Sequence, residues 1–256
     1  MAQTWRDLLF AHWPVPDRTL RPLIPSGLHL ETFDGTAWIS IAPFVVTRLR
    51  PRSAPAIPGL SEFPEINVRT YVTAGGKPGV FFFTLDAGST LAVIGARTLY
   101  FLPYFRARFT VDSTSSGIRY RSRRTQAGAP AAEFRATYRP VGEATVAPPG
   151  TLTAWLTERY CLYAVDRRER IHRAEIHHRP WALQPAEVEI DRNTMTTGLG
   201  FELPDVAPLV QFAAHLDVRV WAPERVDTTP TRNRPGRAVV RTRSGARLWS
   251  GSEPRA

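Results

Sequence analysis

Residues 62–105 constrain the fold of this chain more than any other stretch. Residues 65–72 alternate polar and apolar side chains, whereas residues 79–85 are mostly apolar. Gly75 and Gly76 lie between these segments and can adopt the positive φ angles that a tight turn needs. The order predicts an antiparallel hairpin whose first strand is apolar on one face and polar on the other.

The polar face of that first strand carries the most chemistry in the sequence. Glu65, Asn67, Arg69 and Tyr71 share it, because side chains alternate with a period of two along a strand. Glu65 and Arg69 are about 13 Å apart at roughly 3.3 Å per residue, so they cannot neutralise each other directly. The face points either to water, with ordinary cross-strand ion pairs, or to an internal pocket. Taken alone, the residues favour the exposed face; in a pocket, Arg69 could hold a carboxylate and Glu65 could act as acid or base.

The remaining sequence also predicts a mainly β chain with a few short helices. Asp34-Gly35 is a strong hairpin signal and should join strands at 28–33 and 36–46. Short helices are expected after Asp17 and after Thr151, whose side chains can cap them. A proline-rich segment over 49–64 is expected to form a loop, and further strands are predicted at 106–111, 118–123, 133–138, 159–165, 171–177, 188–191 and 215–221.

Length and charge suggest one domain followed by a basic tail. With 256 residues and 43% hydrophobic content, residues 1–225 can form one large core. Residues 226–256 are rich in arginine, proline and glycine and supply about half of the net charge of +10. That composition predicts a solvated, disordered tail. Nucleic-acid binding through the tail is a weaker alternative. Arginine is abundant throughout the chain, so its frequency in the tail reflects a bias of the whole sequence more than a patch built to bind phosphates.

Several functional classes find little support. The apolar runs fall far short of the roughly 20 residues of a membrane-spanning helix, and no signal peptide is evident. The lone Cys161 fits a reducing compartment. These observations together predict a cytoplasmic protein. His177 and His178 are neighbours that point to opposite faces of a strand, so no metal site is predicted. No nucleotide-binding loop appears, and no cofactor is predicted.

Glu158 and Arg159 are interpreted as a buried ion pair or a second pocket wall.

The order of these motifs resembles a known family. FPEINVRTYV, GGKPG, LDA and GAR…LPY follow one another as in the YqjF-like family of the acetoacetate decarboxylase-like superfamily. FAHWPVP, LRPLIPSGLHLETFDGTAWISIAPF, LTERYCLY and HHRPWALQPAEVE are also similar, so the likeness covers about residues 5–222. It implies an intertwined antiparallel barrel with a few short helices and a central pocket.

The resemblance also implies roles for individual residues. Glu65 falls where the decarboxylases have their catalytic glutamate, and Arg6 falls near their substrate-binding arginine. Tyr104 stands where they have the Schiff-base lysine. A phenol cannot form an imine, and the only lysine of the chain, Lys77, lies in the GGKPG turn. Classical acetoacetate decarboxylase activity is therefore not expected.

The function implied is binding of a small oxo- or carboxylate-bearing molecule in the pocket, without Schiff-base lysine chemistry. In an enzyme of this kind, Glu65 and Tyr104 would be catalytic in lyase- or hydrolase-like acid–base chemistry, and Arg69, Arg6 and Asn67 would bind the substrate. The alternative is a non-catalytic ligand-binding or interaction protein in which the same groups are structural. Either could be a homo-oligomer.

Overall fold

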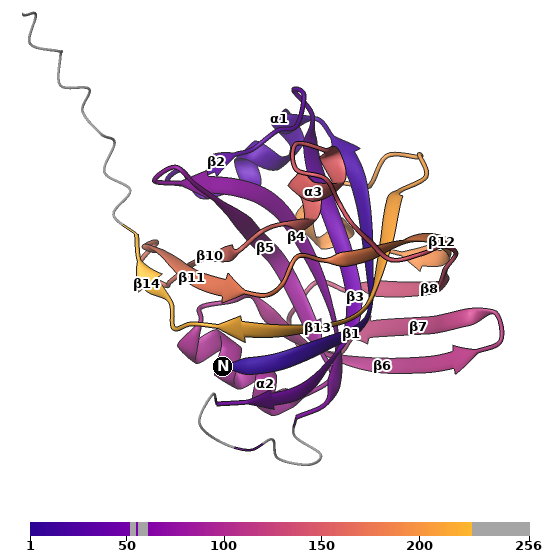
Figure 1. Cartoon of the computed structure of the whole chain (residues 1–256). Coiled ribbons are helices and arrows are strands. Elements are labelled where there is room, and N and C mark those ends of the chain that lie inside the picture. Colours follow the sequence, from indigo (N-terminus) through magenta and orange to yellow (C-terminus); the bar gives the residue numbers. More distant parts are fainter. Residues whose placement is uncertain (52–54, 56–60, 227–256) are drawn as a thin grey trace, which may run out of the picture.

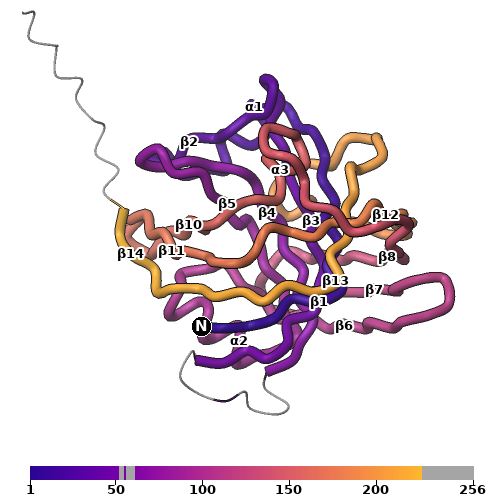
Figure 2. Tube along the Cα trace, in the orientation of Figure 1, coloured from indigo at the N-terminus to yellow at the C-terminus, as the bar shows by residue number. Residues whose placement is uncertain are grey.

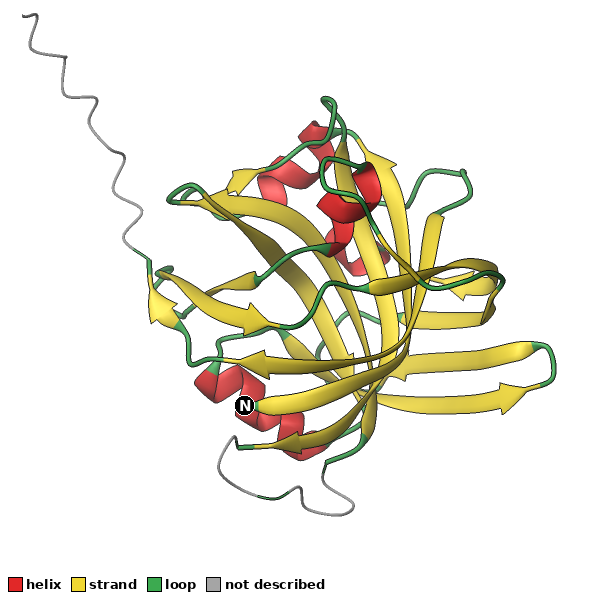
Figure 3. Cartoon of the chain, in the orientation of Figure 1, coloured by secondary structure: helices red, strands yellow, loops and turns green. Residues whose placement is uncertain are grey.

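The structure is a computed structural model that describes residues 1–51, 55 and 61–226. The predicted tail therefore lies outside the described residues, apart from Val226. Strands dominate the described part (Figure 1, Figure 3). They are β1 (Ala2–Val15), β2 (His29–Leu30), β3 (Ala37–Arg50), β4 (Phe63–Ala74), β5 (Lys77–Ala87), β6 (Tyr104–Thr114), β7 (Gly117–Arg124), β8 (Glu133–Pro140), β9 (Thr145–Val146), β10 (Cys161–Val165), β11 (Ile171–His177), β12 (Ala182–Asn193), β13 (Leu209–Val220) and β14 (Glu224–Arg225).

The helices are short, as predicted. They are α1 (Asp17–Leu20), α2 (Thr90–Leu99) and α3 (Leu152–Thr157), with two 3₁₀ turns at Arg21–Leu23 and Thr197–Leu199. Thr151 caps α3 by accepting a hydrogen bond from the backbone N–H of Ala154 at 3.3 Å. None of the helices in the described residues is long and apolar enough to cross a membrane.

The described strands form one sheet that closes on itself twice. One ring runs β5-β6-β7-β8-β12-β13-β1-β3-β4 and closes where β4 pairs with β5. The second ring leaves β5 through β10 and β11 and returns at β13. Figure 2 shows the shared strands in the middle, with β6, β7 and β8 on one side and β10 and β11 on the other. The predicted intertwined antiparallel barrel is confirmed, although β5 pairs in parallel with both β6 and β10 and the closed sheet is not a regular barrel.

The two closures give two hydrophobic cores, and the shared strands contribute to both. On β4, Ile66 and Val68 pack in the core that contains Tyr120. The opposite face of β4 belongs to the core on the side of β10 and β11, where Tyr71 is fully buried. Alternation along the strand therefore separates two interiors, not an interior from solvent.

The predicted hairpin around Gly75 and Gly76 is confirmed. Both glycines have positive φ angles (+59° and +75°), and β4 pairs antiparallel with β5. The predicted pairing of residues 28–33 with 36–46 is wrong. The two segments share a single bridge, between Phe33 and Thr36. β2 pairs with β4 instead, because β1 already occupies the free edge of β3.

Candidate functional site

A cavity of about 360 Å³ lies inside the second ring, between the inner faces of β1, β3, β4 and β5 and helix α2. Its size falls within the range of small-molecule sites. Most of the wall is apolar and includes Trp5, Leu8, Phe44, Phe82, Leu85 and Leu102. Leu91 and Leu99 of α2 also line the cavity and are 61% and 64% exposed, so the cavity opens to solvent beside this helix.

Four of the polar side chains that line this space come from two strands. Glu65, Asn67 and Arg69 come from the cavity-facing side of β4, and Tyr104 from the first residue of β6. The parallel register of β5 and β6 sets Tyr104 beside Leu85, close to the end of β4 that carries Glu65. The Tyr104 hydroxyl donates a hydrogen bond to Oε2 of Glu65 at 2.8 Å.

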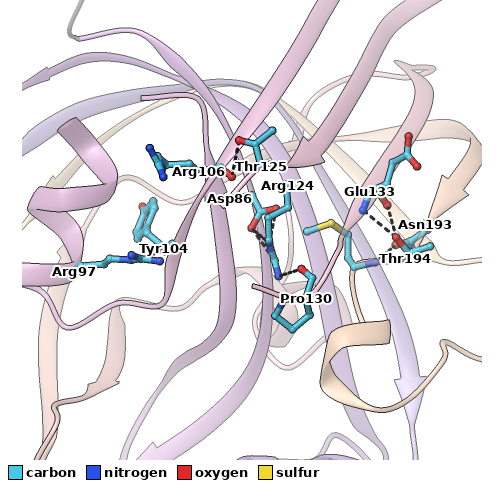
Figure 4. A network of polar contacts seen from close by, with 11 residues as sticks. Asp86, Arg97, Tyr104, Arg106, Arg124, Thr125, Pro130, Glu133, Asn193 and Thr194 are labelled. Carbon is cyan, nitrogen blue, oxygen red and sulfur yellow. Dashed lines mark hydrogen bonds and ion pairs between the residues drawn. The ribbon is translucent and has the colours of Figure 1, made fainter. Parts of the chain in front are cut away.

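Two further contacts hold the start of β6 in place (Figure 4). Nε of Arg97, on α2, donates to the backbone oxygen of Tyr104 at 2.6 Å. Beside it, Asp86 and Arg124 form an ion pair of 2.8 Å whose side chains are almost completely buried, and Arg124 lies over the ring of Phe105 at 4.1 Å. The backbone of Tyr104 and the ring of the next residue, Phe105, are therefore both held in place.

The carboxyl group of Glu65 is buried among groups that favour its neutral form. Burial raises its pKa from 4.5 to about 8, against the opposing effect of the Tyr104 hydrogen bond, and the nearby Asp86 adds to the rise. Burial, reinforced by Glu65, also raises the pKa of Tyr104 well above its usual value. At neutral pH both groups are thus mainly protonated. Because the single proton of the Tyr104 hydroxyl is donated to Glu65, the carboxyl proton of Glu65 is the one available to a carbonyl oxygen.

Arg69 supplies a buried positive charge in the cavity. Its Nε and Nη2 atoms are buried and form no hydrogen bond with any residue that the structure describes. Burial lowers the pKa of Arg69, yet a guanidinium keeps its proton in proteins. The Oδ1 atom of Asn67 is likewise buried without a described partner. Unpaired buried polar groups are costly, and atoms of this kind are normally satisfied by an ordered water or a bound ligand.

A second layer of polar groups lies behind Arg69 and was not predicted. The hydroxyl of Tyr71 lies 3.0 Å from Nδ1 of His12, and both side chains are fully buried. Burial, with the charge of Arg69 as a further cause, holds the pKa of His12 well below its usual range. The sequence offered one signal, the position of Tyr71 on the polar face of β4. It gave no indication that His12, 59 residues earlier, would contact Tyr71.

Other candidates lie elsewhere. The structure does not bring Arg6 to the cavity: its side chain is half exposed, lies 3.8 Å from Asp7 and lines a separate surface hollow. It points outward from β1, opposite to the neighbouring Trp5, which faces the cavity. Lys77 lies at the hairpin end and forms a 2.5 Å ion pair with Glu175.

The predicted ion pair between Glu158 and Arg159 is wrong. Arg159 pairs with Glu31 at 2.5 Å, and Glu158 accepts a hydrogen bond from the backbone N–H of Trp181 at 2.9 Å. Cys161 is buried, as expected of a core residue. Within residues 1–51, 55 and 61–226, no group of three or more histidine, cysteine, aspartate or glutamate side chains is placed to hold a metal ion.

Comparison with solved structures identifies the fold as acetoacetate decarboxylase-like. The enduracididine biosynthesis enzyme MppR, in complex with the condensation product of pyruvate and imidazole 4-carboxaldehyde, superposes with a TM-score of 0.61 at 12% identity, covering 89% of each chain. Acetoacetate decarboxylase from Legionella pneumophila gives a TM-score of 0.55 at 11% identity, covering 88% of this chain and 87% of the other.

Sequence comparison gives the family itself. Residues 2–217 match DUF2071, a family of uncharacterised conserved proteins, and the chain belongs to that family. It is 49% identical over 221 residues to the uncharacterised protein YqjF of Bacillus subtilis, covering 86% of this chain and 90% of the relative. The resemblance inferred from the motif order is confirmed.

Proposed function

We propose that the protein binds a small molecule carrying a carboxylate and a carbonyl group in the central cavity, without Schiff-base chemistry. The observation that carries this proposal is the buried guanidinium of Arg69, whose Nε and Nη2 donors find no partner among the described residues. A carboxylate would accept two parallel hydrogen bonds from such a guanidinium. Among the solved structures of the same fold, MppR was captured with pyruvate, a molecule of this class.

The other end of the cavity suits a carbonyl oxygen. Glu65 and Tyr104 are hydrogen-bonded to each other. The Cα atoms of Glu65 and Arg69 lie about 13 Å apart along β4 by strand rise, so a short keto acid reaches both groups only where the two long side chains turn towards each other. A protonated Glu65 can serve as a general acid, and the Tyr104 hydroxyl, once it turns from Glu65 to the ligand, can stabilise negative charge that develops on the oxygen. Asn67 lies between them on the same face and adds an acceptor. Binding without turnover would use the same contacts, so ligand binding is the first property to test.

Titration calorimetry with pyruvate and acetoacetate tests the proposal. We expect binding by the wild-type protein and a loss of at least about tenfold in Arg69→Met, because each hydrogen bond to a charged group contributes roughly 1.5–3 kcal/mol. Arg121→Gln is the matched control, since this exposed arginine of β7 lies outside the cavity. Equal affinities in the wild type and in Arg69→Met would refute the role of Arg69.

A separate prediction concerns the covalent step. Borohydride treatment of the protein with acetoacetate should leave the intact mass unchanged, because Tyr104 cannot form an imine and Lys77 is held outside the cavity by its ion pair with Glu175. Mass spectrometry of the treated protein provides the measurement. A specific adduct on Lys77 would show that the turn reaches a bound keto acid.

A further inference from the structure

A second concave surface lies on the outer face of the sheet whose inner face forms the cavity. It has a volume of about 640 Å³ and is formed by β1, β3 and β13 together with residues 177–182. We call it the basic groove, because four arginines line it: Arg48, Arg50, Arg179 and Arg219. Asp217 is the only acidic residue among the described residues that line it.

The charge of the basic groove is largely uncompensated. Arg48, Arg179 and Arg219 are exposed and form no ion pair with any residue that the structure describes. The Oδ1 atom of Asp217 is already engaged as a hydrogen-bond acceptor for the hydroxyl of Thr4 at 2.5 Å. The groove is therefore a concave site with an excess of planar cationic groups, which suits an anion with several oxygens.

The position of Arg48 depends on an irregularity in the sheet. The register between β1 and β3 shifts between the pairs Ala2–Arg50 and Thr4–Thr47, so β3 carries one extra residue there. Arg48 has a φ angle of +54°, in the left-handed region that costs a non-glycine residue about 1–3 kcal/mol. Bulges of this kind re-aim side chains and are frequent beside functional sites. Here the bulge accompanies an exposed Arg48 in the groove.

The basic groove borders the cavity. Gln3 and Arg50 line both, and Arg50 is the last residue of β3. A ligand that leaves the cavity past Arg50 would meet the other arginines of the groove. One molecule could thus occupy the cavity with one end and the groove with the other.

We propose that the basic groove binds the phosphate groups of a molecule whose carbonyl-bearing end occupies the cavity. The part of this proposal that concerns the cavity rests on the proposed function above. Phosphates match the groove because bidentate arginine contacts suit their oxygens and because several arginines surround one concavity. The natural ligand would then be an oxo or acyl compound on a phosphate-bearing carrier, larger than a free keto acid.

The experiment uses three probes and three variants of the full chain. Inorganic diphosphate tests the groove, acetoacetate tests the cavity, and malonyl-coenzyme A, which has a free carboxylate, a carbonyl group and phosphates, carries both ends. Arg48→Gln/Arg219→Gln removes two charges from the groove. Arg121→Gln/Arg123→Gln is the matched control, since it removes two charges from exposed positions on β7, and Arg69→Met tests the cavity.

We expect diphosphate to bind the wild type, the control and Arg69→Met alike, and at least about tenfold more weakly to the groove variant. Malonyl-coenzyme A should bind more tightly than either single-ended probe and lose affinity in both the groove variant and Arg69→Met. Equal diphosphate affinity in the groove variant and the control would overturn the proposal, as would a two-ended probe that binds no better than diphosphate.

Two further outcomes distinguish this proposal from the proposed function of the cavity and from nucleic-acid binding. If diphosphate binding depends on the groove arginines while acetoacetate does not bind at all, the proposed function of the cavity fails and the phosphate site stands. If a single-stranded oligonucleotide displaces diphosphate and binds with a steep salt dependence, the groove serves nucleic acid and the small-molecule assignment is overturned.

Discussion

Replacing Arg124 with methionine is expected to lower the free energy of unfolding by about 3–5 kcal/mol, the cost of leaving one partner of a buried ion pair without its counter-ion. Asp86 is fully buried and accepts hydrogen bonds from Nε and Nη2 of Arg124 at 3.0 and 2.8 Å. Burial already raises the pKa of Asp86, and Arg124 opposes that rise. Urea unfolding at neutral pH measures the loss.

The same series contains its own controls. Arg135→Met breaks an ion pair with Glu133 in which the arginine is half exposed, and it should cost less than about 1 kcal/mol. The double variant Asp86→Leu/Arg124→Met should recover much of the loss, because it removes the unpaired buried charge. A cost below about 1 kcal/mol for Arg124→Met alone would mean that Asp86 finds another partner or water.

The second large effect concerns Glu65 and pH. The folded protein raises the pKa of Glu65 to about 8 from 4.5, so between these two values the native state holds a proton that the unfolded state releases. The contribution of this group to stability is complete below pH 4.5 and declines as the pH rises towards 8, by up to about 1.4 kcal/mol per pH unit. Glu65→Gln keeps the shape of the side chain and cannot ionise. Its stability relative to the wild type should therefore rise steadily from pH 5 to pH 8.

Urea unfolding of both proteins at pH 5, 6.5 and 8 gives the difference directly, and effects of other titrating groups cancel. Glu187→Gln is the control, because Glu187 lies in an exposed ion pair with Arg139, and its difference from the wild type should change little. A constant difference between Glu65→Gln and the wild type would show that Glu65 is ionised throughout this range.

The parts of the fold that the sequence predicts are those with local signals. The hairpin of β4 and β5 follows from two glycines and a change in polarity pattern, and α3 follows from the capping residue Thr151. β1 carries no such signal, because residues 8–13 are buried on both faces and do not alternate in polarity. α2 was also missed, although Ser89 caps it by accepting a hydrogen bond from the backbone N–H of Ala92 at 3.3 Å.

In the candidate site, too, the sequence predicts what depends on local spacing and misses what depends on contacts between distant segments. Period-two alternation places Glu65, Asn67 and Arg69 on one face of β4, but only the closed sheet determines that this face lines a cavity. Contacts between distant segments leave no trace in local spacing, which is why Arg159 was assigned to Glu158 and not to Glu31, 128 residues away. The role of Arg6 was transferred from a resemblance, and the outward direction of its side chain depends on the course of β1, which the sequence did not reveal.

The position of β4 between two interiors ties the site to the integrity of the whole sheet. A slip of one residue in the pairing of β4 would turn Glu65 and Arg69 into the core around Tyr120 and bring Ile66 and Val68 into the cavity. Such a state would bury uncompensated charge and leave the cavity without its polar groups. Non-native registers are therefore both unstable and unable to bind, and ligand affinity can serve as a direct reporter of correct strand pairing during refolding.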